Sequence, residues 1–309
     1  MFDTITYEGH RILPITSDIV FKAIFADEKN KELLFSLLKA YLEIPAASPD
    51  DIKIVSPEKN KRFYDDKLFR LDIRIVTAQG EHIDVEIQMR DEKNMVKRSL
   101  FYASTLYAEQ MRESMGYSEL GRAVALNILC YTTDKDSEFI RSWRLYDTQS
   151  RQEATDALEL VFVELPHAQV TELTSLRDKW TALLTAESEE DLNRLMRTDQ
   201  IFEKVVETLV YVSEQEKVRF AFDQRRKATF DAAARDIDMK RYARSEGLAE
   251  GKAEGKAEGI AEGLAEGLAE GITEIVTQMV LKNYTYDQIS DITGLSHEQI
   301  KNLVDDPAK

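Results

Sequence analysis

The chain has few of the residues that build disulfide-linked or zinc-stabilised folds. Its 309 residues include one cysteine, Cys130, four histidines and six prolines. One cysteine cannot form an internal disulfide, and such sparing use is typical of a reducing compartment. The histidines are scattered along the sequence, which argues against a zinc site of histidine and cysteine. We therefore expect a cytoplasmic protein whose fold depends on a hydrophobic core.

Long apolar runs are also missing. No stretch approaches the roughly 20 apolar residues that a membrane-spanning helix needs, and the opening sequence MFDTITYEGHRI lacks the apolar segment of a signal peptide. Hydrophobic residues nevertheless make up 43% of the chain, which is enough for a sizeable core. The composition predicts a folded protein that does not act on a membrane.

The chain is strongly acidic, but its charge is distributed unevenly. The formal net charge of −16, taken alone, argues against a nucleic-acid partner. Residues 1–110 carry a net charge of only −3, whereas the remaining 199 residues carry −13. The acidity is therefore mostly a property of the rear of the chain.

Hydrophobic periodicity predicts a mixed α/β fold for residues 11 to about 180. Thr16 and Ser17 are suited to cap a first helix that begins near Asp18. Alternating strands and helices predict a central mixed β-sheet flanked by helices, followed by a helical C-terminal extension. The expected helices cover residues 18–25, 32–42 and 93–115, and the expected strands cover 52–55, 123–131 and 158–165.

Residues 68–89 show the alternation of a β-hairpin around a turn that contains Gly80. A three-residue loop at 78–80 would pair positions whose numbers sum to 158. Arg74 would then face Asp84, and Asp72 would face Glu86. Any register that keeps the apolar side chains together leaves the carboxylates of Asp72 and Glu86 on the opposite face.

Two carboxylates on neighbouring strands can hold a hard divalent cation through their oxygen atoms. Such an ion can activate water and neutralise the charge on a phosphodiester. Alternating charges are, however, also typical of the solvated face of an ordinary hairpin, and spacing alone favours that simpler interpretation.

Four segments in order carry a family resemblance: DIVFKAIF at 18–25, LDIRI at 71–75, VEIQM at 85–89, and a helix that contains Arg98, Tyr102 and Tyr107. Together they resemble the Rpn family of recombination-promoting nucleases, also described as transposases, in the PD-(D/E)XK nuclease superfamily. The resemblance covers roughly residues 11–245. It implies a restriction-endonuclease-like fold, DNA as partner, Mg²⁺ as cofactor with Mn²⁺ as a substitute, and a link to recombination.

The resemblance also implies roles for individual residues. Asp72 and Glu86 match the two acidic metal ligands, and the carbonyl of Ile87 matches an additional ligand. Asp18 resembles the acidic residue on the first helix of the fold, which reaches the metal directly or through water. A favourable charge at the start of a helix explains Asp18 equally well.

Gln88 departs from the superfamily pattern, which usually has lysine at this position. A lysine would offer a positive charge to the nucleophile or the phosphate, whereas glutamine offers only neutral hydrogen bonds. Lys22, Lys97 or Arg98 would then contact the phosphate and supply the missing charge from a helix. The alternative is a weakly active site. Tyr102 is interpreted as a packing residue.

The rear of the chain contains a basic stretch and a repeat. Residues 219–244 hold eight Lys or Arg and four Asp, which suits phosphate contacts or, equally simply, a solvated helix. Residues 247–271 have glycine at every fourth position. Glycine costs a helix roughly 1 kcal/mol relative to alanine, so this repeat is either a helical stem that self-associates or a flexible acidic linker.

The last segment has clear helix punctuation. Thr285 with Gln288, and Ser296 with Gln299, form two candidate capping boxes, and Gly294 between them suits a helix stop. This pattern resembles a helix-turn-helix. Its second helix has one lysine and no arginine, so protein interaction or folding is favoured over reading of DNA bases.

These observations divide the chain into a nuclease-like domain at 1–215, a basic helical segment at 216–245, the repeat at 246–271 and a helix-turn-helix-like unit at 272–309. The predicted function is a magnesium-dependent DNA endonuclease of low sequence specificity. The alternative is a catalytically degenerate module that binds DNA or protein. In either case we expect a homo-oligomer formed through the C-terminal helical region.

Overall fold

The computed structural model describes residues 4–55, 73–134 and 138–305. The chain divides into two compact units, residues 1–228 and 229–309. No helix in the described parts of the chain is long and apolar enough to cross a membrane.

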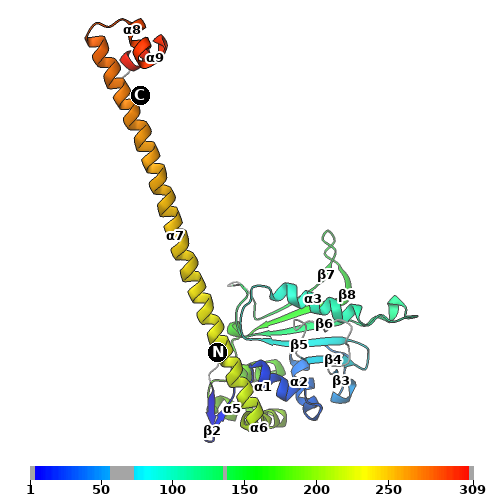
Figure 1. Ribbon diagram of the computed structural model, residues 1–309. Helices are drawn as coiled ribbons and strands as arrows, with labels where there is room; N and C mark the ends of the chain where they lie inside the picture. The colour runs from blue at the N-terminus through cyan, green and yellow to red at the C-terminus, as the bar shows by residue number, and fades with distance from the viewer. Residues whose placement is uncertain (1–3, 56–72, 135–137, 306–309) are drawn as a thin grey trace. The chain divides into compact units, whose positions relative to one another are not determined.

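The first unit is built on a six-stranded mixed sheet with strand order β3-β4-β5-β6-β8-β7 (Figure 1). Strands β5, β6 and β8 run parallel to one another, and the neighbours at both edges pair antiparallel. A separate hairpin, β1 with β2, lies near the N-terminus. The strands are β1 (Ile5–Tyr7), β2 (His10–Ile12), β3 (Ile52–Val55), β4 (Ile73–Thr77), β5 (His82–Gln88), β6 (Ala123–Leu129), β7 (Ile140–Tyr146) and β8 (Glu153–Glu164).

The hairpin register predicted from the sequence is confirmed for the described part of β4. Ile73 pairs with Val85, Arg74 with Asp84, and Ile75 with Ile83, so each pair of numbers sums to 158. The apolar members of these pairs are almost fully buried. Asp72, the residue expected to face Glu86, lies outside the described residues.

One face of the sheet is covered by helices from both ends of the first unit. Ile75, Val85 and Leu126 on the strands share a single core with Phe25 and Trp180 on the helices. The rings of Phe25 and Trp180 lie 5.8 Å apart, which adds aromatic contact to the burial of apolar area. The helices on this face are α1 (Asp18–Phe25), α2 (Lys31–Tyr41), α4 (Leu176–Leu184), α5 (Glu189–Met196) and α6 (Gln200–Glu214).

The other face of the sheet carries α3 (Met95–Ala108), which packs on β5, β6 and β8 (Figure 1). The sequence predicts a longer helix, to residue 115. The helix ends early because the side chain of Gln110 binds the backbone of Gly121. Its amide N–H donates to the carbonyl of Gly121 at 2.9 Å, and its amide oxygen accepts from the N–H of Gly121 at 2.8 Å. A site on this face of β5 is therefore covered by α3 and does not lie on an open hairpin surface.

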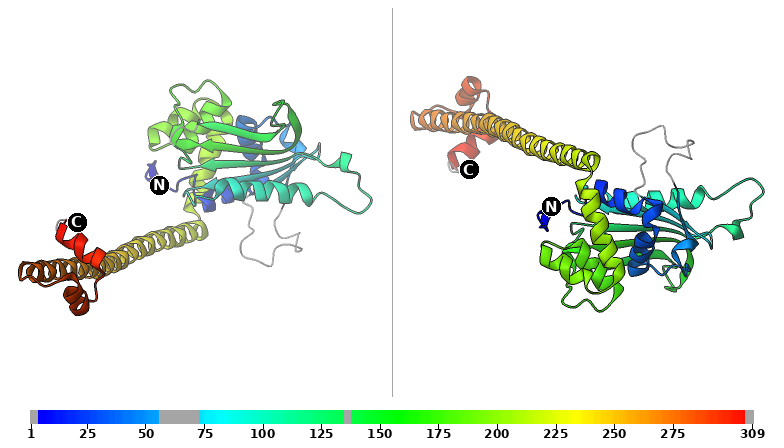
Figure 2. Two further views of the ribbon diagram at one scale, coloured as in Figure 1. Left: turned by 90° about the horizontal axis from the view of Figure 1, so that it is seen from above. Right: turned by 90° about the horizontal axis from the view of Figure 1, so that it is seen from below.

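The long helix α7 (Glu216–Leu281) contains the whole glycine repeat and continues into the second unit. The repeat is therefore helical in this structure, and open space surrounds the Cα of each of its glycines. The second unit ends with α8 (Tyr286–Thr293) and α9 (His297–Asp305). Figure 2 shows these two short helices beside the last turns of α7.

The punctuation predicted for the C-terminal segment is confirmed. Thr285 and Gln288 form a reciprocal capping box. Ser296 and Gln299 form a second one, in which the backbone N–H of each residue donates to the side-chain oxygen of the other. Gly294 is left-handed, with φ of 74°, as a helix stop requires. Val276, Ile289 and Ile300 form the small buried core that holds the three helices together.

The close approach of Gly121 to Gly80 gives a test of this fold. A Cβ atom at residue 121 would collide with the backbone carbonyl of Gly80. We expect Gly121→Ala to lower the free energy of unfolding of the first unit by about 1–3 kcal/mol, because backbone must move. Urea unfolding followed by the fluorescence of Trp143 and Trp180, both in the first unit, measures the change.

Gly116→Ala is the matched control for this substitution. It has φ of −80°, and the nearest atom to an added Cβ is the side-chain oxygen of Glu119 at 3.3 Å, which can move. Its unfolding curve should stay close to that of the wild type. Equal destabilisation by both substitutions would contradict the contact between Gly121 and Gly80.

Candidate functional site

The candidate site lies on β5, a strand that is hydrogen-bonded on both sides. Asp84, Glu86 and Gln88 alternate along it and share the face toward α3, because successive side chains of a strand point to opposite faces. Asp84 is 1% exposed and Glu86 is fully buried, whereas Gln88 is partly exposed. The site therefore has a buried acidic interior and one polar residue nearer solvent.

Glu86 is contacted by a neutral donor and by a cation. The side-chain amide of Gln88 donates to one carboxylate oxygen at 3.3 Å. The guanidinium of Arg98, from the first turn of α3, donates to the carboxylate at 3.4 Å. The same guanidinium lies 3.8 Å from Glu92 and 5.4 Å from the centre of the Tyr102 ring. Arg98 thus bridges a buried carboxylate and the partly solvated end of the site.

The protonation of the groups around Glu86 follows from their surroundings. Burial lowers the pKa of Arg98, but Glu86, Tyr102 and Glu92 together outweigh this effect and the pKa is raised. Burial raises the pKa of the Tyr102 hydroxyl. At neutral pH the site therefore presents a permanent cation and an intact phenol beside Glu86.

The position of Arg98 is fixed through its neighbour in sequence. Asn127 on β6 is the strand partner of Glu86, and its side-chain amide donates to the hydroxyl of Ser99 at 2.8 Å and to the carbonyl of Val161 at 3.1 Å. Asn127 and Ser99 are both buried. This bond attaches the first turns of α3 to the sheet, so that Arg98 reaches Glu86.

A second charged pair lies further along the same hairpin. Arg74 on β4, the strand partner of Asp84, donates to the carboxylate of Glu109 at 2.6 Å, and both side chains are about nine-tenths buried. The pair attaches β4 to the C-terminal end of α3. Arg74 and Arg98 thus hold α3 against the hairpin from its two ends.

The other residues predicted from the sequence lie in different places. Asp18 begins α1 and forms an ion pair with Arg225 of α7, with Oδ2 3.3 Å from Nε. Asp18 thus lies in the first turn of α1, where a negative charge is favourable at the start of a helix. Lys22 lies in the last turn of α1, and Lys97 is exposed on α3. The side chain of Ile87 points away from Glu86, into the core on the opposite face.

The donor chemistry of the site fits a hard divalent cation. The described residues contain no group of three or more His, Cys, Asp or Glu arranged to hold a metal ion. Asp84 and Glu86 nevertheless place two buried carboxylates two residues apart on one face, and such cations prefer oxygen ligands. Asp72, which the sequence resemblance predicts as a metal ligand, lies outside the described residues.

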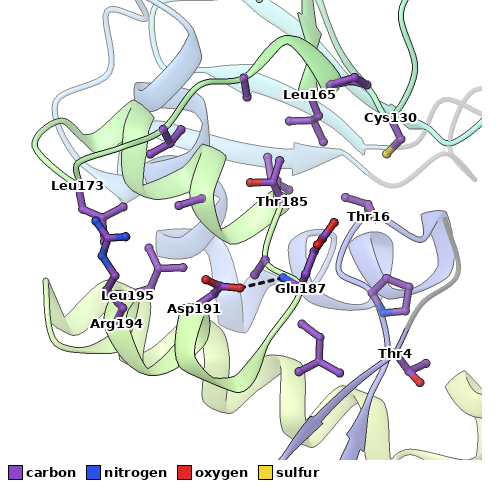
Figure 3. A pocket seen from close by; sticks show the side chains of 18 residues that line it. Thr4, Thr16, Cys130, Leu165, Leu173, Thr185, Glu187, Asp191, Arg194 and Leu195 are labelled. Atoms are coloured by element: carbon purple, nitrogen blue, oxygen red, sulfur yellow. Dashed lines mark hydrogen bonds between the residues drawn. The ribbon is translucent and has the colours of Figure 1, made fainter.

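A separate hollow of about 940 Å³ in the first unit is lined by apolar residues such as Leu165, Leu173 and Leu195, with Cys130 at its edge (Figure 3). Burial raises the pKa of the Cys130 thiol to about 11, so the thiol stays protonated at neutral pH. Glu86, Gln88 and Arg98 do not line this hollow. The hollow is therefore separate from the candidate site on β5.

A model of the PD-(D/E)XK nuclease family transposase matches residues 15–237 of the chain. The chain belongs to this family. The matched range includes the whole sheet, α3 and the candidate site, and the central mixed sheet flanked by helices agrees with the restriction-endonuclease-like fold expected from the sequence. No curated protein and no solved structure matches the chain.

Two residues of the site, Asp84 and Asn127, were not predicted from the sequence of this chain. Asp84 shares its face with Glu86, as the two-residue period of a strand already indicates. Asn127 is the single polar residue in the apolar run AVALNIL. A lone amide in a strand that is buried on both faces needs hydrogen-bond partners, and that requirement was the signal for its role.

His82, at the start of β5, provides a test of the electrostatics of this face. Burial, together with the charges of Arg74 and Arg112, lowers the pKa of His82 to about 4. Between about pH 6.5 and 4 the unfolded chain binds a proton that the folded chain does not. The free energy of unfolding should therefore fall as pH falls through this range, and the loss should be complete near pH 4.

Urea unfolding of the wild type and His82→Gln at several pH values between 7 and 4 measures this effect. The variant should lose less stability on acidification, because it lacks the group that binds the proton. His297→Gln, at an exposed histidine of the second unit, is the control. Parallel pH profiles for the wild type and His82→Gln would contradict the lowered pKa.

Proposed function

We propose that this chain is a divalent-metal-dependent DNA endonuclease of low sequence specificity that acts in the cytoplasm in recombination. The observation that supports it most is the buried Glu86 on the middle strand, which faces a guanidinium from α3 and an amide from Gln88. A fully buried carboxylate at this position of a nuclease-family sheet is costly unless it has a charge partner or a function.

The metal would be Mg²⁺, with Mn²⁺ able to substitute, held by Asp72, Glu86 and the carbonyl of Ile87. When bound, such an ion supplies Lewis-acid activation of water and neutralises charge on the phosphodiester. Oxygen donors of this kind suit both ions. Asp84 would strengthen the negative potential that attracts the ion, since it lies on the same face of β5.

The remaining residues would bind and orient the DNA. Arg98 can direct several N–H groups at a phosphate oxygen and so replaces the lysine that the superfamily usually has at the position of Gln88. Gln88 would keep Glu86 oriented through its amide. Lys97 is exposed one residue before Arg98, and with Lys22 it would add phosphate contacts.

The alternative function is a catalytically degenerate module that binds DNA or protein. Two observations favour it: Gln88 carries no charge, and the guanidinium of Arg98 already compensates Glu86. A degenerate module would bind DNA with the usual salt dependence but would cleave no phosphodiester bond. The two functions differ in a plasmid-nicking assay.

Glu86→Gln tests the endonuclease directly. The substitution keeps the shape of the side chain and removes the charge, so nicking of supercoiled plasmid in Mg²⁺ should fall at least about 100-fold, the upper loss seen for residues that only support metal ligands. Tryptophan fluorescence and circular dichroism should show a folded protein.

Glu92→Gln is the matched control, because Glu92 also lies near Arg98 but its side chain is 62% exposed. Its nicking rate should stay within about twofold of the wild type, as expected for an exposed carboxylate that does not hold the metal. Nicking by Glu86→Gln at the wild-type rate would exclude the endonuclease mechanism. Absence of nicking by pure wild-type protein in Mg²⁺ and in Mn²⁺ would favour the degenerate module.

A second test concerns the source of the positive charge. Arg98→Gln should lower kcat for nicking by about 10²–10³, the usual effect of removing one donor that stabilises developing charge. Gln88→Lys added to Arg98→Gln should restore part of the activity, because it returns a cation to the same carboxylate and phosphate. The kcat of Arg98→Lys should lie between that of the wild type and that of Arg98→Gln.

The ranking of the nicking rates of these variants decides whether Arg98 supplies the positive charge of the site. If Gln88→Lys fails to raise the activity of a folded Arg98→Gln protein, Arg98 does not perform the role of the family lysine. Unfolding curves measured in parallel separate loss of activity from loss of the charge partner of buried Glu86.

A further inference from the structure

The basic stretch at 219–244 begins in the first unit, and there acids of the same unit compensate part of its charge. The guanidinium of Arg225 pairs with the carboxylate of Asp18 at the start of α1. That of Arg226 lies 3.7 Å from the carboxylate of Asp223, one turn earlier on α7. This half of the stretch therefore helps to attach α7 to the first unit.

The half that lies in the second unit has a different environment. Lys240, Arg241 and Arg244 are all exposed on α7. Among the residues that the structure describes, none of these three cations has an acidic partner within ion-pairing distance. Their charge is therefore directed at solvent and is available to a partner outside the chain.

Helical geometry places these three cations on one side of α7. At 3.6 residues per turn, Lys240, Arg244 and Arg241 fall within an arc of about 100°. Lys240 and Arg244 lie about 6 Å apart along the helix axis. The neighbouring acids Asp236, Asp238 and Glu246 project outside this arc. We call Lys240, Arg241 and Arg244 the basic patch.

The rest of the second unit is strongly acidic. Residues 229–309 contain nine Lys or Arg and 16 Asp or Glu, a net charge of −7. Residues 239–245 contribute three cations and no acid, so the remainder of the unit carries −10. Residues 246–270 alone hold seven glutamates against two lysines. The basic patch is therefore the place on α7 of this unit where an anion is attracted, and the repeat beyond it repels anions.

The shape of the patch favours a polyanion over a small ion. An exposed helix is convex and cannot enclose a phosphate or sulfate ion, and a single exposed ion pair contributes little. A polymer of phosphates can contact all three cations at once and gains from the release of its counterions. The separation of Lys240 and Arg244 corresponds to about two nucleotide steps, at roughly 3.4 Å of duplex axis for each phosphate of one strand.

We propose that the basic patch binds the phosphate backbone of the DNA on which the chain acts. The patch holds the duplex without reading its bases, because backbone contacts carry no direct sequence information. From the proposed function this inference takes only DNA as the substrate, and it requires no cleavage.

The salt dependence of DNA binding by the full-length protein tests the patch. Fluorescence anisotropy of a labelled 30-bp duplex, measured in EDTA to prevent cleavage, gives Kd over a series of salt concentrations. Three phosphate contacts contribute roughly 2.7 to the slope of log Kd against log salt concentration, about 0.9 for each. Lys240→Gln/Arg241→Gln/Arg244→Gln should lower the slope by about this amount and raise Kd at least about tenfold at low salt.

Lys252→Gln/Lys256→Gln/Lys282→Gln is the matched control. It removes three exposed cations from the same helix and changes the net charge equally, but it leaves the basic patch intact. Glutamine forms helices nearly as well as lysine and arginine, so circular dichroism should show unchanged helix content in both variants. The control should keep the wild-type slope, and the loss in the patch variant should be equal for two duplexes of unrelated sequence.

Four results would overturn the proposal: a wild type that binds no duplex in EDTA, a patch variant with the wild-type slope, a control variant with the same loss as the patch variant, or polyglutamate that competes as well as duplex DNA. Plasmid nicking by the same proteins separates this inference from the endonuclease. A chain that binds through the patch but never nicks would refute only the endonuclease, and an active nuclease with unchanged binding in the patch variant would refute only the patch.

Discussion

The ionic contact between Glu86 and Arg98 is the constraint on which the site depends. β5 has a strand on each side and α3 above it, so water cannot reach the Glu86 carboxylate. A buried charge of this kind is tolerated only with a partner and hydrogen bonds. Among the described residues, α3 delivers a guanidinium there, and the Asn127–Ser99 bond attaches α3 to the sheet. The position of α3 and the charge balance of Glu86 on β5 therefore depend on each other, because a shift of α3 would remove the guanidinium from Glu86.

The two faces of the sheet therefore differ in composition: one is apolar core, and the other carries the charged and polar residues. The face under α1, α2, α4, α5 and α6 is continuous apolar core and supplies most of the stability. The face under α3 carries smaller apolar clusters between its charged and polar residues. Polar groups gather there because α3 is attached through Arg74 and Glu109 at one end and through Arg98 and Glu86 at the other. Such attachments stabilise less than apolar packing but fix positions more closely.

Sequence patterning could predict the sheet and the register of its central hairpin, because a two-residue period with a short turn leaves little freedom. It placed Glu86 and Gln88 on one face and gave Arg98 as one of three candidate cations. It could not predict the burial of that face, since burial depends on where α3 packs. Nor could it predict the partner of Asp18, because Arg225 is about 200 residues further along the chain. Local periodicity carries no information on contacts of that range.

The neutrality of Gln88 is consistent with the presence of Arg98. Glu86 has one close described cation on its own face, and a lysine at residue 88 would place a second beside it. Two cations on one carboxylate would weaken the attraction of the site for a divalent ion, because the negative potential that draws the ion would be cancelled. With an amide at 88, the guanidinium balances the buried charge in the free protein, and under the proposed function Glu86 would hold the metal ion while Arg98 would contact a phosphate. Placing the cation on α3 instead of β5 keeps it at the partly exposed side of the site, where a phosphate could be contacted, while Glu86 stays in the sheet.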